Sequence, residues 1–157
     1  MQGDSRMIEA LNARLAEELT AINQYTVHAE MLENWHYGKL YGPVWKRTIT
    51  EMKHAEKLIE RILFLDARPI VSNLNPMHIG EVVGDMHKND LDAEYGAVRN
   101  YNESIKLAVE VGDNGTKDLL EGILADEESH VDWLEAQLQQ IEQTGTENYL
   151  AESITQD

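Results

Sequence analysis

The chain has 157 residues, of which 42% are hydrophobic and 27% charged, and its formal net charge at pH 7 is -16. This length suits one core, so we expect a single domain over residues 1–157. The acidic surface attracts cations and repels nucleic acid and anionic membranes. Because the chain has no cysteine, disulfides, zinc–thiolate sites and cysteine-ligated iron–sulfur clusters are excluded.

The N-terminal residues carry no targeting signal. The stretch MQGDSRMIEALNARLAEEL is amphipathic and charged, and it has no apolar run of signal-peptide type. No segment approaches the ~20 apolar residues that a bilayer span needs. We therefore expect a cytoplasmic protein that binds neither membranes nor nucleic acid.

Apolar residues at steps of three and four predict an all-α fold with four long helices. The expected ranges are 5–34, 43–66, 81–111 and 116–144, with a short fifth helix in TENYLAES. Residues suited to helix ends mark these bounds: Asp4 or Ser5 as the first N-cap, Gly38 in the first turn, Pro43 opening the second helix, Gly145 ending the fourth, and Thr146 capping the fifth.

The link ARPIVSNLNPMHIG between the second and third helices is long for a turn between antiparallel neighbours. It predicts a crossover along the length of a four-helix bundle. Each predicted buried stripe also carries acidic residues near its middle, namely Glu18, Glu51 with His54, Glu94, and Glu127 with His130.

An E-x-x-H pair is by itself a weak signal, and the chain has a third one, Glu33–His36. An internal repeat separates them. The pair Glu127–His130 follows Glu51–His54 by 76 positions, and EYGAVRNY (94–101) follows ELTAINQY (18–25) by the same interval. Since Glu33–His36 has no such mate, we interpret it as a surface pair.

Four carboxylates converging in a core repel one another and lose hydration. We expect no Arg or Lys on the buried stripes near them, so two divalent cations, with the imidazoles as neutral ligands, offer the best compensation. Mixed carboxylate and imidazole donors without thiolate favour iron or manganese over zinc, calcium or magnesium. Bridging carboxylates around two ions suit activation of O₂ or peroxide, as in di-iron bundles.

Over its whole length the chain resembles the bacterioferritins, in MQGD, EELTAINQY, EMKHAEKLIERILFL, DEESHVDWLE and GTENYL. The resemblance implies a ferritin-like four-helix bundle with a long crossover between helices 2 and 3 and a short C-terminal fifth helix. It also implies iron storage in a homo-oligomeric cage of about 24 subunits built from two-fold dimers. Such a cage oxidises Fe²⁺ with O₂ or H₂O₂, deposits ferric mineral, and releases iron when a ferredoxin-type reductant supplies electrons.

The resemblance further implies a ferroxidase centre for two iron ions per subunit. Its catalytic and metal-binding residues are Glu18, Glu51, His54, Glu94, Glu127 and His130. By the same resemblance Glu51 and Glu127 bridge both ions, Glu18 and His54 complete one ion, and Glu94 and His130 complete the other. Tyr25 is close to the centre, where it packs or donates a hydrogen bond or an electron.

Met52 is implied as the ligand of a haem b shared between two subunits. It falls on the stripe Met52, Ala55, Ile59 and Leu63, an apolar face that a single bundle need not bury, and the expected flanking residues are Leu19, Ile22, Asn23 and Trp45. Thr26 departs from the aromatic residue usual in the family at that position. It therefore loosens one wall of the expected haem site.

Two further departures concern iron traffic. Lys46 and Thr50 stand where some bacterioferritins carry a His and an Asp that form an inner-surface iron site, so iron is expected to pass through the centre itself. Asp132, which matches Glu56 in the repeat, is a candidate for the access path. From the residues alone, a di-iron or di-manganese oxygenase, a manganese catalase, and a haem electron-transfer or cation-buffering protein remain alternatives.

Overall fold

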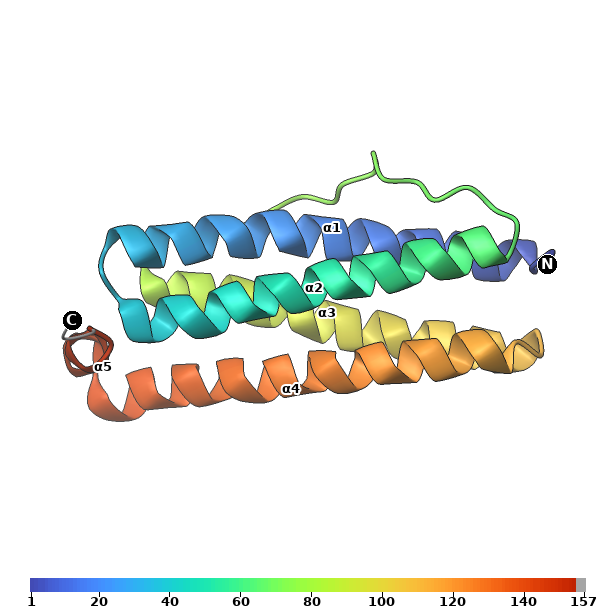
Figure 1. Cartoon of the computed structure of the whole chain (residues 1–157). Helices are drawn as coiled ribbons and strands as arrows, with labels where there is room; N and C mark the ends of the chain where they lie inside the picture. Colours follow the sequence, from blue (N-terminus) through green and yellow to red (C-terminus); the bar gives the residue numbers. More distant parts are fainter. Residues whose placement is uncertain (155–157) are drawn as a thin grey trace.

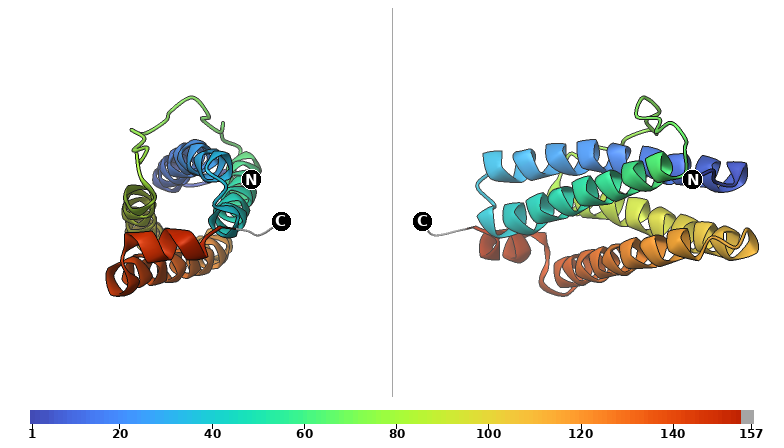
Figure 2. Two further views of the ribbon diagram at one scale, coloured as in Figure 1. Left: turned by 90° about the vertical axis from the view of Figure 1, so that its left-hand side faces the viewer. Right: turned by 45° about the vertical axis from the view of Figure 1, so that its right-hand side comes forward.

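A computed structural model describes residues 1–154, which form five helices and no strand (Figure 1). The helices are α1 (Ser5–Asn34), α2 (Gly38–Phe64), α3 (Val83–Glu110), α4 (Asn114–Thr144) and α5 (Thr146–Glu152). α1 packs beside α2 and α3, and α4 packs beside the same two helices. The end-on view of Figure 2 shows these four helices as a closed bundle. The predicted all-α four-helix bundle with a short fifth helix is confirmed.

The first turn of α1 confirms one of the two expected N-caps. The Asp4 carboxylate accepts hydrogen bonds from the backbone N–H groups of Arg6 and Met7, at 2.8 and 3.3 Å. The turn after α1 differs from the prediction. His36 takes the left-handed conformation, with φ 62°, and Gly38 is already the first residue of α2.

α2 begins at Gly38, so the prediction that Pro43 opens this helix is wrong. Proline removes the helical hydrogen bond to the residue four positions earlier, which normally favours a helix start at that point. Here the preceding turn is held by tertiary contacts. Leu40 is buried in an apolar cluster, and the Lys39 N–H donates to the Ser153 carbonyl oxygen at 3.1 Å. Burial therefore outweighs the local preference.

The crossover predicted at ARPIVSNLNPMHIG spans residues 65–82 in the structure and runs along the outside of the bundle from the end of α2 to the start of α3 (Figures 1 and 2). Four side chains of α1 accept hydrogen bonds from its backbone N–H groups: Asn12 accepts from Ile70, Thr20 from Asn75, Gln24 from His78, and His28 from Gly80. Gly80 is required here because a Cβ would lie 2.4 Å from the Met86 nitrogen.

Two apolar clusters occupy the two ends of the bundle. One is centred on Leu11, Leu15, Leu58, Tyr101 and Ile123, and the other on Leu32, Leu40, Val44, Met86 and Tyr149 of α5. The buried acidic residues lie between them. The bundle therefore holds a polar layer in its middle, enclosed by apolar packing on both sides.

α4 ends at Gly145, which has φ 85°, as the sequence predicts. α5 follows at once, but Gly145 is its N-cap and Thr146 makes no capping hydrogen bond, so the capping role expected of Thr146 is wrong. Within residues 1–154, no helix has the length and apolar character to cross a membrane.

Candidate metal centre

Six side chains from the four long helices meet in the middle of the bundle. They form two groups, Glu18, Glu51, His54 and Glu127, and Glu51, Glu94, Glu127 and His130, and within each group the ligand atoms lie within 4.8 Å of one another. Glu51 and Glu127 belong to both groups. The structure thus brings together all six residues that the sequence repeat singled out.

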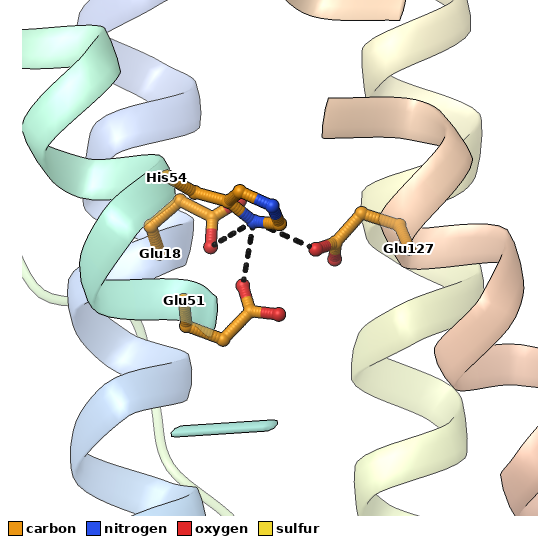
Figure 3. A group of neighbouring side chains, drawn as sticks. All are labelled: Glu18, Glu51, His54 and Glu127. Atoms are coloured by element: carbon orange, nitrogen blue, oxygen red, sulfur yellow. Dashed lines mark ion pairs between the residues drawn. The ribbon is translucent and has the colours of Figure 1, made fainter. Parts of the chain in front are cut away.

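The first group surrounds the Nδ1 atom of His54, as Figure 3 shows. This nitrogen lies 3.0 Å from Glu127 Oε1, 3.5 Å from Glu51 Oε2 and 3.6 Å from Glu18 Oε2. All four side chains are at most 2% exposed. They come from α1, α2 and α4 and point toward one common space.

The second group surrounds the Nδ1 atom of His130. Glu51 Oε1 lies 3.1 Å away, Glu94 Oε1 3.3 Å and Glu127 Oε1 3.8 Å. The His130 side chain is 15% exposed, against 1% for His54. The two halves of the centre therefore carry the same ligand types but differ in their access to solvent.

Most of the converging atoms have no hydrogen-bond partner. Unsatisfied buried atoms include Glu18 Oε2, Glu51 Oε1, Glu94 Oε2, Glu127 Oε1 and the Nδ1 atoms of His54 and His130. A buried polar atom without a partner costs about 1–3 kcal/mol, and more when it is charged. Cations between the lone pairs would satisfy these atoms together, which makes this donor set a fit for two metal ions.

Hydrogen bonds behind the ligands fix their orientation. His54 Nε2 lies 2.8 Å from Asp126 Oδ2, an arrangement that places the proton on Nε2 and leaves Nδ1 free to bind metal. Tyr25 donates to Glu94 Oε1 at 2.7 Å, and Tyr101 donates to Glu18 Oε1 at 2.6 Å. The sequence did not assign a role to Asp126 or Tyr101, although Tyr101 is the repeat mate of Tyr25.

Burial and like charge dominate the protonation of the centre. Burial raises the pKa values of the Glu51 and Glu127 carboxyls well above their usual range, and the charge of the Glu18 carboxylate adds to both shifts. Burial lowers the pKa of His54, but the neighbouring carboxylates of Glu127, Glu18 and Glu51 outweigh it and raise that pKa. Burial likewise raises the pKa of Glu94, and contacts with His130 and Glu127 reverse the shift. In the metal-free centre these shifts favour protons on Glu51, Glu127 and His54.

The expectation that no Arg or Lys lies on the buried stripes near the centre is wrong. Arg47 is buried, and its Cζ lies 4.4 Å from the ring centroid of Tyr25. Its guanidinium is paired with Asp90, however, with Nη2 2.5 Å from Asp90 Oδ2. Since no ion pair joins Arg47 to the six central residues, Arg47 does not neutralise the four carboxylates.

Two cavities reach the centre from opposite faces of the bundle. One, of about 440 Å³, lies beneath the crossover and includes Glu18, Glu51 and Glu127 in its wall. The other, of about 470 Å³, lies between α2 and α4 and is lined by His130 and Asp126. Each is large enough for hydrated ions or small oxidants. Glu33 and His36, in contrast, are exposed at the end of α1, away from both cavities.

A ferritin-like domain model matches residues 8–144 of the chain. The bacterioferritin of Rhodobacter capsulatus is 41% identical over 149 residues, covering 95% of this chain and 92% of the relative. That of Brucella melitensis biotype 1 is 40% identical with the same coverage, and that of Mycolicibacterium paratuberculosis is 39% identical over 155 residues, covering 99% and 98%. The chain belongs to the bacterioferritin family.

Within this bacterioferritin fold, Met52 lies half-buried on α2, immediately after the buried Glu51. Its stripe is mixed: Ala55 is only 5% exposed and belongs to the core, whereas Leu63 is 57% exposed. This face, which a single bundle need not bury, is therefore buried at Ala55 and exposed at Leu63. The residues expected to flank a haem, Leu19, Ile22, Asn23 and Trp45, are all half-buried or exposed.

Lys46 and Thr50 line the cavity between α2 and α4, together with Asp126 and His130. Asp126, with a side chain 49% exposed, is the only carboxylate in that wall within the part of the chain that the structure describes. Asp132 lies instead in two surface hollows that contain none of the six central residues.

Proposed function

We propose that this chain is the subunit of an iron-storage cage whose bundle centre is a ferroxidase for two Fe²⁺ ions. Membership of the bacterioferritin family supports iron storage. The observation that carries the ferroxidase is the pair of four-residue ligand groups that share Glu51 and Glu127. A structural layer of acidic residues would have no reason to be doubled in this way.

The ligand types favour iron as the substrate. Each proposed site offers three carboxylates and one imidazole, and no thiolate, a set that suits Fe²⁺ or Mn²⁺ better than structural zinc, calcium or magnesium. Glu18 and His54 would complete one site, and Glu94 and His130 the other. Bridging by Glu51 and Glu127 would hold two ions some 3.5–4 Å apart, the spacing of two-metal sites.

The proposed reaction removes one electron from each of two Fe²⁺ ions and passes both electrons to O₂ or H₂O₂. Oxygen takes up two protons and becomes H₂O₂, whereas H₂O₂ takes up two protons and becomes two waters. The Fe³⁺ product then hydrolyses to ferric oxide mineral and releases protons. The buried carboxylates hold the ions together and offset their charge, while Tyr25 and Tyr101 fix the carboxylates of Glu94 and Glu18.

Storage requires a cage, and we propose a homo-oligomer of about 24 subunits built from two-fold dimers. The crossover exposes a run of apolar side chains, Ile70, Val71, Leu74, Met77, Ile79 and Val82, each at least 36% exposed. A surface of this kind suits contact between subunits. Size-exclusion chromatography of the apoprotein should give a mass of several hundred kilodaltons rather than the mass of one or two chains of 17.9 kDa.

We further propose that Met52 binds a haem b shared by two subunits of the dimer. The half-buried position of this thioether fits a ligand at a subunit interface better than a core methionine. Two such thioethers make a neutral, soft ligand pair, and a haem held in this way supplies one-electron transfer. Electrons from a ferredoxin-type protein would then reduce stored Fe³⁺ for release.

Stopped-flow absorbance after mixing with Fe²⁺ and oxidant tests the ferroxidase. We expect rapid oxidation in the wild type and its loss in Glu18→Gln and His130→Gln. The matched control is Glu33→Gln with His36→Gln, which alters an exposed E-x-x-H pair outside the centre. Unchanged kinetics in Glu18→Gln and His130→Gln would instead favour a haem electron-transfer protein, and a small oligomer that turns over organic substrates would favour an oxygenase.

A further inference from the structure

The two halves of the centre have matching phenol contacts. Tyr25 donates to Glu94 Oε1 at 2.7 Å and Tyr101 donates to Glu18 Oε1 at 2.6 Å, and both tyrosines are at most 1% exposed. Tyr101 follows Tyr25 by the repeat interval of 76 positions. Each half therefore has one terminal carboxylate whose orientation depends on one buried phenol.

The surroundings of the two phenols differ. The Arg47 guanidinium lies over the Tyr25 ring, with Cζ 4.4 Å from the ring centroid. The same Cζ lies 5.7 Å from the ring centroid of Trp133, and both residues line the cavity between α2 and α4. The residue 76 positions after Arg47 is Ile123, which belongs to the same buried apolar cluster as Tyr101. A cation thus faces one phenol, and an aliphatic environment surrounds the other.

Arg47 is held in place by a buried network. Its Nη2 pairs with Asp90 Oδ2 at 2.5 Å, and Asp90 Oδ1 lies 2.9 Å from both Gln24 Nε2 and His28 Nδ1. His28 Nε2 accepts from the Gly80 N–H at 2.9 Å, so the imidazole proton is on Nδ1 and is donated to Asp90. The guanidinium is therefore anchored from α1, α3 and the end of the crossover.

We propose that Arg47 is a positioning residue for the Glu94 half of the centre. It fixes the ring of Tyr25, and the Tyr25 hydroxyl in turn fixes the Glu94 carboxylate. Among residues 1–154 no cation lies over the ring of Tyr101, so the two metal sites differ in how rigidly their terminal carboxylate is held. This inference rests on the proposed ferroxidase centre.

Charge repulsion between Arg47 and a bound cation would act in the opposite direction, and removing Arg47 would then strengthen metal binding. The pair with Asp90 offsets most of this charge, because opposite charges at 2.5 Å present little net field to an ion further away. Positioning should therefore outweigh repulsion, and loss of Arg47 should weaken metal binding at the Glu94 half alone.

The test uses Co²⁺ in place of Fe²⁺, under anaerobic conditions, with binding followed by the visible absorption of Co²⁺. Arg47→Met is combined with Asp90→Asn so that no unpaired carboxylate is left buried, and Arg47→Lys is a second variant that keeps the pair but not the planar stacking. We expect one of the two Co²⁺ ions to bind about tenfold more weakly in the double variant, and about threefold more weakly in Arg47→Lys.

Background substitutions identify the affected half. The Glu18→Gln background keeps the Glu94 half intact, and there loss of Arg47 should weaken binding of the remaining Co²⁺ ion about tenfold. In the Glu94→Gln background, loss of Arg47 should not change Co²⁺ binding. In a Tyr25→Phe background, loss of Arg47 should weaken Co²⁺ binding by less than about threefold, because the contact that transmits the effect is already gone. In a Tyr101→Phe background, loss of Arg47 should have its full effect on Co²⁺ binding.

Each result has a distinct meaning. Equal weakening of both Co²⁺ ions, or full additivity with Tyr25→Phe, would make Arg47 a packing residue and overturn the positioning role while leaving the ferroxidase proposal intact. Tighter Co²⁺ binding after loss of Arg47 would show that repulsion dominates and overturn it as well. Failure of the wild type to bind any Co²⁺ would instead remove the metal centre, and with it this inference. Circular dichroism confirms that each variant is folded.

Discussion

Glu51 and Glu127 each contact both imidazoles of the centre. Glu51 places Oε2 3.5 Å from His54 Nδ1 and Oε1 3.1 Å from His130 Nδ1, and Glu127 Oε1 lies 3.0 and 3.8 Å from the same two atoms. No other carboxylate of the two ligand groups belongs to both. This geometry sets Glu51 and Glu127 apart from Glu18 and Glu94, and it supports the proposal that they bridge the two metal ions.

The first prediction separates bridging from terminal carboxylates. Glu51→Gln should weaken the binding of both metal ions about 100-fold, because one carboxylate serves both sites. Glu94→Gln should weaken the binding of only one ion. Anaerobic titration with Co²⁺ measures the stoichiometry directly. If Glu51→Gln still bound one ion at wild-type affinity, Glu51 would not be a bridge.

The repeat allowed the six clustered residues to be predicted, because the same residue types recur at both ends of the interval. The roles of Arg47 and Asp126 could not be predicted, because neither residue is repeated. The residue 76 positions after Arg47 is Ile123, and Asp126 is one of three consecutive acidic residues with nothing in the sequence to mark its contact with His54. Single residues that act through a tertiary contact leave no periodic signal.

Local helix signals were likewise reliable only where local energetics decide the structure. Asp4 satisfies the first backbone N–H groups of α1 by itself, so its capping role could be predicted. The start of α2 depends on the burial of Leu40 and on a hydrogen bond to Ser153, more than a hundred positions away in the chain. Such distant contacts override the preference of Pro43 for a helix start.

A second prediction concerns protons. Because burial raises the pKa of Glu51 and Glu127, these carboxyls hold protons in the metal-free protein at pH values where free carboxyls do not. Metal ions must displace those protons, so Co²⁺ binding should acidify a weakly buffered solution, and its apparent affinity should rise with pH. An indicator dye detects the release, and Glu51→Gln should reduce it.

The same shifts fix the sign of the stability change in the metal-free protein. A folded-state pKa above the unfolded value of 4.5 contributes stability below that value, which is lost as pH rises through the folded pKa. Relative to Glu51→Gln, which keeps this position neutral, chelator-treated wild type should lose unfolding free energy between pH 5 and pH 8 in urea unfolding. A difference that instead moved in favour of the wild type over this range would contradict the burial effect.

A third prediction concerns the net charge of -16 per chain. Electrostatic attraction of Fe²⁺ is screened by salt, so the initial rate of iron uptake should fall as ionic strength rises. Asp92 lines the cavity beneath the crossover, whereas Asp132 does not. Asp92→Asn should slow uptake about twofold to threefold, and Asp132→Asn, the matched control, should not. Equal rates in both variants would argue against guidance through this cavity.

A fourth prediction concerns the haem. Met52→Leu should keep the oligomer and the rate of Fe²⁺ oxidation but lose the haem absorbance bands, since leucine offers no ligand atom. Met31→Leu is the control, because Met31 is also half-buried on a long helix but packs against the apolar cluster near α5. Retention of an unchanged haem spectrum in Met52→Leu would leave Met52 as a packing residue only.

The last prediction concerns the attachment of α5 and its dependence on pH. His87 of α3 is 1% exposed, and its Nε2 lies 3.0 Å from the hydroxyl of Tyr149 in α5. That hydroxyl donates to Gln137 Oε1 at 2.6 Å, so it accepts the Nε2–H of His87, and the Nδ1 atom is left buried without a partner. A proton added at Nδ1 would have no acceptor. His87 should therefore stay neutral in the folded protein.

Burial lowers the pKa of His87 to about 4 from a usual 6.5, with smaller and opposing effects of the Arg47 and Asp90 charges. A base with a lowered folded-state pKa contributes stability above its unfolded pKa and loses it as pH falls toward the folded value. The free energy of unfolding should thus fall by about 2 kcal/mol between pH 7 and pH 5 from this residue alone. In His87→Gln this part of the pH dependence should vanish, whereas substitution of the exposed His78 by Gln should leave it in place. An equal pH dependence in His87→Gln and the wild type, measured by urea unfolding, would show that His87 already carries its proton in the folded state.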